Sequence, residues 1–91
     1  MNTASFESEL QRDNFTTETK TQPAGVSVPA HAHDFDVRAM VVDGEITLGV
    51  AGKSTTYRKG DTFALDAGCV HTELYGPAGV TYVVGRRQTG A

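Results

Sequence analysis

Turn-forming residues divide this sequence from residue 15 onward into short segments, and this division limits the fold more than any other feature. The segments between the turns are rich in threonine, valine and aromatic residues, and several alternate polar with apolar residues. Strands are predicted at 15–22, 37–42, 45–50, 54–58, 62–65, 71–75 and 80–87. Asp43-Gly44 has the composition of a hairpin turn, and the segment 76–79 that of a loop between strands. Many short strands without alternating helices indicate an all-β antiparallel sandwich or barrel.

The first thirteen residues differ in character from the rest of the chain. Phe6 and Leu10 are four residues apart among polar neighbours, as on one face of a helix. A short amphipathic helix and an irregular lead-in both fit this pattern. We therefore expect an N-terminal lead-in at 1–13 and a single all-β domain, a sandwich or a barrel, at 14–91.

Length, charge and cysteine content restrict the cell compartment and the partners. The 91 residues suffice for one small domain, which a metal ion or a partner subunit would help to stabilise. A net charge of −3 argues against a nucleic-acid partner, because such binding relies on clustered Lys and Arg. The single cysteine, Cys69, excludes an intramolecular disulfide and fits a reducing compartment. With neither a signal-peptide pattern nor a membrane-spanning apolar run, the sequence predicts a cytoplasmic protein.

The three histidines are spaced as metal ligands. His31 and His33 are two positions apart, so in an extended strand their side chains point to the same face. His71 follows about forty residues later in a second glycine-bounded segment. Imidazole is the commonest metal-binding side chain near neutral pH. The spacing predicts one divalent-metal site whose ligands a closed β structure brings together from two strands.

The strand that follows the histidine pair has apolar residues on both faces. Counting alternate residues from His33 places Val37, Ala39 and Val41 on the inner face. Asp36 faces the other way and could bind the ion only if a β-bulge shifted the register. Met40 and Val42 also lie on the outer face, where apolar side chains need a cover. A second copy of the chain would provide that cover, so we expect a homodimer.

Glu73 and Tyr75 are the candidate catalytic residues, because they share the face of His71. Glu73 could be a fourth metal ligand, or a general base whose pKa an apolar pocket raises. The alternative for Glu73 is a solvated carboxylate at the barrel rim. For Tyr75 the alternative is core packing, with the hydroxyl bonded at the edge of the core.

Both glycine-bounded segments resemble the two sequence motifs of the cupin superfamily. Gly25, His31, His33 and Gly44 fall on the spacing of the first motif, and Gly60, Gly68 and His71 on that of the second. Three positions depart from the motifs: Val37 replaces a glutamate, Asp66 a proline and Tyr75 an asparagine. The resemblance covers roughly residues 20 to 86 and implies a small jelly-roll barrel, also called a double-stranded β-helix.

The resemblance also implies a class of function. A three-histidine site at His31, His33 and His71 would hold a divalent transition metal, namely Fe, Ni, Zn, Co, Cu or Mn. Single-domain cupins include dioxygenases, isomerases and lyases, so we expect a metal-dependent enzyme acting on a small oxygenated or anionic molecule. Cupin domains also serve as small-ligand binding or sensor modules. In that case this chain would act through a partner, since no helix-turn-helix accompanies it.

Overall fold

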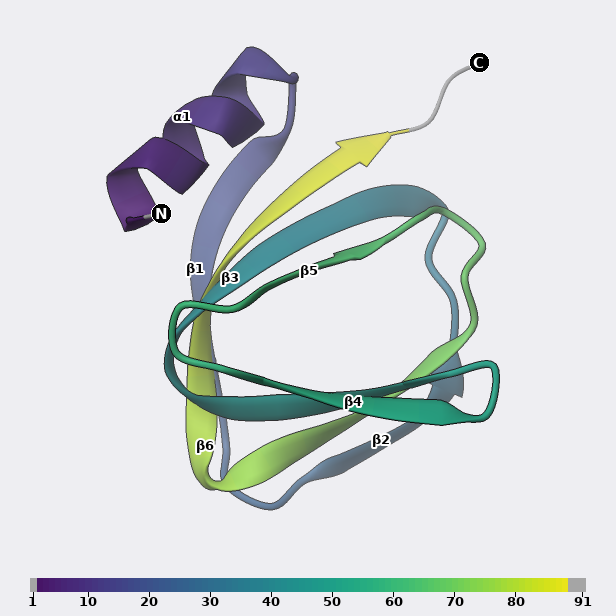
Figure 1. Ribbon diagram of the computed structural model, residues 1–91. Helices are drawn as coiled ribbons and strands as arrows, with labels where there is room; N and C mark the ends of the chain where they lie inside the picture. The colour runs from purple at the N-terminus through teal and green to yellow at the C-terminus, as the bar shows by residue number, and fades with distance from the viewer. Residues whose placement is uncertain (1, 89–91) are drawn as a thin grey trace.

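The fold is an antiparallel β-barrel with one helix packed on its outside (Figure 1). The computed structural model describes residues 2–88. Its elements are α1 (Thr3–Arg12), β1 (Thr16–Gln22), β2 (Ser27–His31), β3 (Phe35–Val50), β4 (Lys53–Arg58), β5 (Thr62–Leu65) and β6 (His71–Gln88). Every strand pair among the described residues is antiparallel. The predicted jelly-roll barrel is therefore confirmed, and its lead-in is a helix.

Two long strands, β3 and β6, hold the barrel together. Strand β6 pairs with β2 through residues 71–74 and with β1 through residues 80–86. Strand β3 pairs with β4, β5 and β6. Figure 1 shows both long strands curving around the barrel, so each contributes to more than one wall.

Two turn predictions are wrong. Strand β3 continues through Asp43-Gly44, where a hairpin was expected, and β6 continues through 76–79, where a loop was expected. Gly44 and Gly79 have φ values of 73° and 78°, and the pairing of β3 with β6 is irregular around Gly44. A Cβ atom on Gly44 would collide with the carbonyl oxygen of Gly79. The two glycines therefore let paired strands bend and approach closely, and they do not end the strands.

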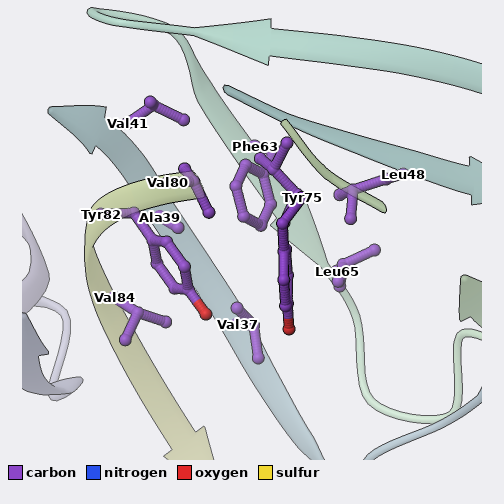
Figure 2. Close-up of a cluster of buried hydrophobic side chains, with 11 residues drawn as sticks. Val37, Ala39, Val41, Leu48, Phe63, Leu65, Tyr75, Val80, Tyr82 and Val84 are labelled. Carbon is purple, nitrogen blue, oxygen red and sulfur yellow. The ribbon is translucent and has the colours of Figure 1, made fainter. Parts of the chain in front are cut away.

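The inner face of the barrel holds the main hydrophobic core (Figure 2). Its buried residues are Val37, Ala39, Val41, Ile46, Leu48, Phe63, Leu65, Tyr75, Val80, Tyr82 and Val84. The predicted inward phase of residues 37, 39 and 41 is thus right. Figure 2 shows the hydroxyl groups of Tyr75 and Tyr82 directed toward the same end of this core. One end of the barrel interior is therefore polar.

Helix α1 covers the outer face of β3 and β6. Phe6 and Leu10 are buried against Met40 of β3 and Val83 of β6, with Phe15 completing this second cluster. The four-residue spacing of Phe6 and Leu10 places both on the side of α1 that faces the sheet. The ten-residue helix is too short to cross a membrane, and no described helix is long and apolar enough to do so.

This packing changes the argument for a homodimer. Met40 belongs to the cluster under α1, and Val42 packs against the same cluster. The outer face of β3 is therefore covered by the chain's own helix. The homodimer stays a prediction, but an uncovered outer face of β3 is no longer an argument for it.

Candidate metal centre

The three histidines meet Glu73 in one cluster. His31 is the last residue of β2 and pairs across the sheet with His71, the first residue of β6. His33 lies in the connection to β3, so the two neighbouring histidines do not share one strand as expected. One ligand atom from each of the four side chains lies within 4.8 Å of the others. Strand pairing thus brings together two parts of the sequence that are far apart.

Backbone carbonyl groups fix the orientation of two imidazole rings. Nδ1 of His31 lies 2.8 Å from the carbonyl oxygen of Pro29, and Nδ1 of His71 lies 3.0 Å from that of Cys69. Because a carbonyl oxygen can only accept, each of these Nδ1 atoms carries the proton when the ring is neutral. Each Nε2 then presents its lone pair to the cluster, which is the tautomer that binds a metal ion through Nε2.

The Nε2 atom of His71 is buried and has no hydrogen-bond partner. Leaving such an atom unsatisfied costs about 1–3 kcal/mol. Its neighbour at 3.5 Å is Oε2 of Glu73, and in this tautomer both atoms are acceptors, so they form no hydrogen bond. A cation between them would satisfy both atoms. The residues present therefore fit a metal ion.

The two carboxylate oxygens of Glu73 have different neighbours. Oε2 lies 3.2 Å from Nε2 of His31, while Oε1 accepts a hydrogen bond of 3.1 Å from the hydroxyl of Tyr75. The Glu73 side chain is only 15% exposed, so it is not a solvated carboxylate at the rim. Tyr75 packs in the core and bonds at its hydroxyl, and it joins the polar cluster to the apolar interior.

Asp36 points away from the cluster and has partners of its own. Its carboxylate accepts hydrogen bonds from the backbone N–H of Ala67 (2.9 Å) and from the guanidinium of Arg87 (3.2 Å). The Ala67 bond and then the Arg87 bond hold the pKa of Asp36 below its usual value. No bulge turns Asp36 inward, and Val37 lines the barrel interior in its place.

Burial sets the protonation states of two groups near the cluster. It lowers the pKa of His33, and the neighbouring imidazoles of His71 and His31 lower it further. It raises the pKa of Tyr75, an effect that the charge of Glu73 reinforces. At neutral pH His33 is therefore a neutral imidazole and Tyr75 a protonated hydroxyl.

A cavity of about 150 Å³ adjoins the cluster. His33, His71 and Glu73 line it together with apolar core residues. Lys20 and Arg86 line it too, and sequence reasoning missed both. The inward direction of Lys20 follows only from the strand register. Lys20 pairs with Tyr82, whose side chain faces the barrel interior, and paired residues lie on the same face of a sheet.

Comparison with known proteins identifies the family of this chain. The family model described as "Cupin domain" matches residues 17–73, which is more than half of the chain. The chain belongs to the cupin family. No curated protein matches it. In this cupin, the carboxylate of the cluster comes from Glu73 on β6, and Val37 stands where the motif has a glutamate.

Solved cupin structures are similar in fold. An RmlC-like cupin from Shewanella frigidimarina is 21% identical with a TM-score of 0.70, covering 82% of this chain and 67% of that one. The cupin domain of Schizosaccharomyces pombe Cnp3 is 17% identical with a TM-score of 0.72, covering 82% of this chain and 53% of that one. A protein of unknown function from Rhizobium leguminosarum bv. viciae is 16% identical with a TM-score of 0.77, covering 85% and 73%. Identities this low indicate a shared fold alone.

Proposed function

We propose that this cupin is a metal-dependent enzyme of the dioxygenase, isomerase or lyase type that acts on a small oxygenated or anionic molecule. The observation that supports this most directly is the hydrogen bond from Tyr75 to Glu73 beside the histidines, at the wall of the cavity. It joins a proton donor to a proton acceptor where a substrate would lie.

His31, His33, His71 and Glu73 would hold the ion. Three neutral imidazoles and one carboxylate suit a divalent transition metal better than Mg or Ca, which prefer oxygen ligands. Glu73 reduces the charge of the site by one, which compensates for the absence of a carboxylate at position 37. A bound ion would supply Lewis-acid polarisation of a substrate oxygen.

Glu73 and Tyr75 have separate tasks in this proposal. Oε2 of Glu73 faces the imidazoles, so Oε1 is the oxygen that can take a proton from a substrate carbon. The raised pKa of Tyr75 keeps its hydroxyl protonated at neutral pH. Tyr75 therefore orients Glu73 in the free protein and can donate a hydrogen bond to a substrate oxygen.

The cavity limits the size and character of the substrate. Its volume of about 150 Å³ is small beside the ~300–1,000 Å³ of pockets for drug-sized ligands. Apolar walls that include Val37, Leu48 and Leu65 keep water away from the substrate. Electrostatic interactions with the site are stronger in such surroundings than in water.

The first experiment measures metal. Metal content of protein purified without chelators is compared between the wild type and a His31→Ala/His33→Ala double variant. Asp34→Ala is the matched control, because Asp34 is exposed and adjoins the pair. We expect metal in the wild type and the control and a sharp loss in the double variant. Equal content in all three would contradict a histidine metal centre.

The second experiment measures chemistry on the metal-loaded protein. Oxygen uptake is screened with small oxygenated acids, and NMR in D₂O follows proton exchange at the carbon next to the keto group of 2-oxobutyrate. If exchange occurs, Glu73→Gln should abolish it, and Tyr75→Phe should slow it by about 100-fold. Binding of these acids with neither oxygen uptake nor exchange would favour the alternative, a binding or sensor module.

A further inference from the structure

We propose that Lys20 and Arg86 bind a second anionic group of the substrate, so that the ligand of this cupin is a small dicarboxylate. The inference rests on the proposed function, because the other carboxylate of the ligand would meet the metal centre. It concerns a different part of the cavity and two residues outside the cupin motifs.

Both cations lie on the cavity side of the barrel wall. Lys20 of β1 and Arg86 of β6 line the same cavity as His33, His71 and Glu73. Their side chains are 33% and 43% exposed, so each charged group can reach solvent as well as a ligand at the opening. Two cations at the opening of a cavity attract an anion and fix its orientation.

A stack of rings links Arg86 to the metal centre. The Phe35 ring lies parallel to the His33 ring with centroids 4.7 Å apart, and the Arg86 guanidinium lies 5.3 Å from the Phe35 centroid. The guanidinium is thus no further than about 10 Å from the His33 ring, the sum of the two distances. A small dicarboxylate can span a separation of that size when a contact of about 3 Å at each end is included.

In the free protein, Glu18 forms an ion pair with each of the two cations, Lys20 and Arg86. Its Oε1 atom lies 3.5 Å from Nζ of Lys20 and 3.3 Å from the guanidinium of Arg86. The Glu18 side chain is 51% exposed, and exposed ion pairs of this kind contribute little to stability. A ligand carboxylate can therefore displace Glu18 at small cost. Glu18 then acts as an internal competitor for the anion.

The charge of the site favours a dianion. Lys20 and Arg86 are balanced by Glu18 and Glu73, so these four side chains carry no net charge together. A divalent ion at the proposed centre then leaves two positive charges without a partner. A ligand with one negative charge neutralises half of this excess, and a dicarboxylate neutralises all of it.

The test compares dicarboxylates with monocarboxylates of equal chain length. Calorimetry on the Zn²⁺-loaded protein measures the affinity for malate against 2-hydroxybutyrate, and for 2-oxoglutarate against 2-oxopentanoate. At least one dicarboxylate should bind about tenfold more tightly than its match. Lys20→Gln and Arg86→Gln should each lower the dicarboxylate affinity more than the monocarboxylate affinity, so that the advantage shrinks. Circular dichroism and Zn²⁺ content matching those of the wild type show that the variants fold.

Two further variants sharpen the test. Glu18→Gln removes the internal competitor, so it should raise dicarboxylate affinity, whereas loss of an ordinary structural contact would not. Lys53→Gln removes an exposed lysine of β4 that does not line this cavity, and it should change nothing. Equal affinity within both acid pairs, or an advantage that survives the Lys20→Gln/Arg86→Gln double variant, would overturn the inference. Failure of the metal-loaded wild type to bind any of the four acids would also overturn the inference, whereas failure of the wild type to take up Zn²⁺ would overturn the proposed function.

Discussion

The carboxylate of Glu73 lies 3.2 Å from Nε2 of His31, although the two residues belong to different strands. The motif position for a carboxylate on the strand after the histidine pair is occupied by Val37. Glu73 approaches the same cluster from β6, where the pairing of His31 with His71 brings it within reach. A carboxylate can thus be supplied from a different strand without loss of the cluster.

Glu73→Gln should weaken divalent-metal binding by at least about 100-fold. The amide keeps the size of the side chain but loses its charge, and even outer-shell partners of metal ligands are worth about 10–100-fold in affinity. Competition against a coloured chelator measures the change. A variant that binds Zn²⁺ as tightly as the wild type would show that Glu73 is not a ligand.

A carboxylate at position 37 should partly restore the metal affinity that Glu73→Gln loses. Val37 lines the same cavity as His33 and His71, so Val37→Glu in the Glu73→Gln background returns an anionic group to the site. We expect metal affinity to recover by about tenfold or more, through the restored charge attraction. Val37→Gln in the same background is the matched control and should give no recovery. Equal affinities of the Glu and Gln variants would contradict the expectation.

Metal affinity should fall as the pH drops below roughly 6 to 6.5, where ordinary histidines take up protons. Only the neutral imidazole binds the ion, so each protonation competes with the metal. His33 contributes to the lower part of this fall, because its pKa lies below the usual value. Zn²⁺ titrations at several pH values measure the effect. A constant affinity from about pH 7.5 to about pH 5 would argue against histidine ligands.

Asp36→Asn should destabilise the fold at neutral pH but not in acid. The lowered pKa means that the folded protein favours the charged form of Asp36 more than the unfolded chain does. Its contribution is therefore present above the unfolded pKa, near 3.9, and is lost as the pH falls through the lower folded-state pKa. Urea unfolding should show a difference at pH 7 that shrinks below about pH 4. Asp34→Asn, at an exposed site two residues away, should show neither effect.

Gly44→Ala should cost several times more stability than Gly52→Ala. Both glycines have positive φ, at 73° and 79°, so each alanine bears a left-handed strain of about 1–2 kcal/mol. At Gly52 the new methyl group meets nothing within 4 Å, whereas at Gly44 it meets the backbone of Gly79. Chemical denaturation measures the free energy of unfolding of both variants. The loss at Gly52 reports the backbone strain alone, and the additional loss at Gly44 reports the collision with Gly79. Equal losses would mean that β3 and β6 do not approach as closely as described.

Leu10→Ala should lower the free energy of unfolding by about 2–5 kcal/mol, as for other buried leucines. Leu10 is fully buried between α1 and the barrel. Ser8→Ala, an exposed position of the same helix, is the control and should have little effect. A Leu10→Ala variant as stable as the control would indicate that α1 does not pack on β3 and β6 in solution.

The alternation of residues along the chain was enough to predict much of this protein. It indicated an all-β antiparallel fold, the inward phase of Val37, Ala39 and Val41, and the outward direction of Asp36. The resemblance to the cupin motifs narrowed that fold to a barrel. The same alternation placed Glu73 and Tyr75 on the side of His71. These predictions succeed because side-chain direction in a strand depends on local backbone geometry alone.

Other features depended on what lies across the sheet or over it. Gly44 looks like a hairpin turn in sequence, but it bends β3 because Gly79 of β6 lies against it. Met40 looks like part of a dimer face, but the chain's own helix covers it. In both cases the local sequence pattern specifies only a tendency, to turn or to be buried. Which distant segment packs against the residue depends on long-range contacts, and only the tertiary structure determines those contacts.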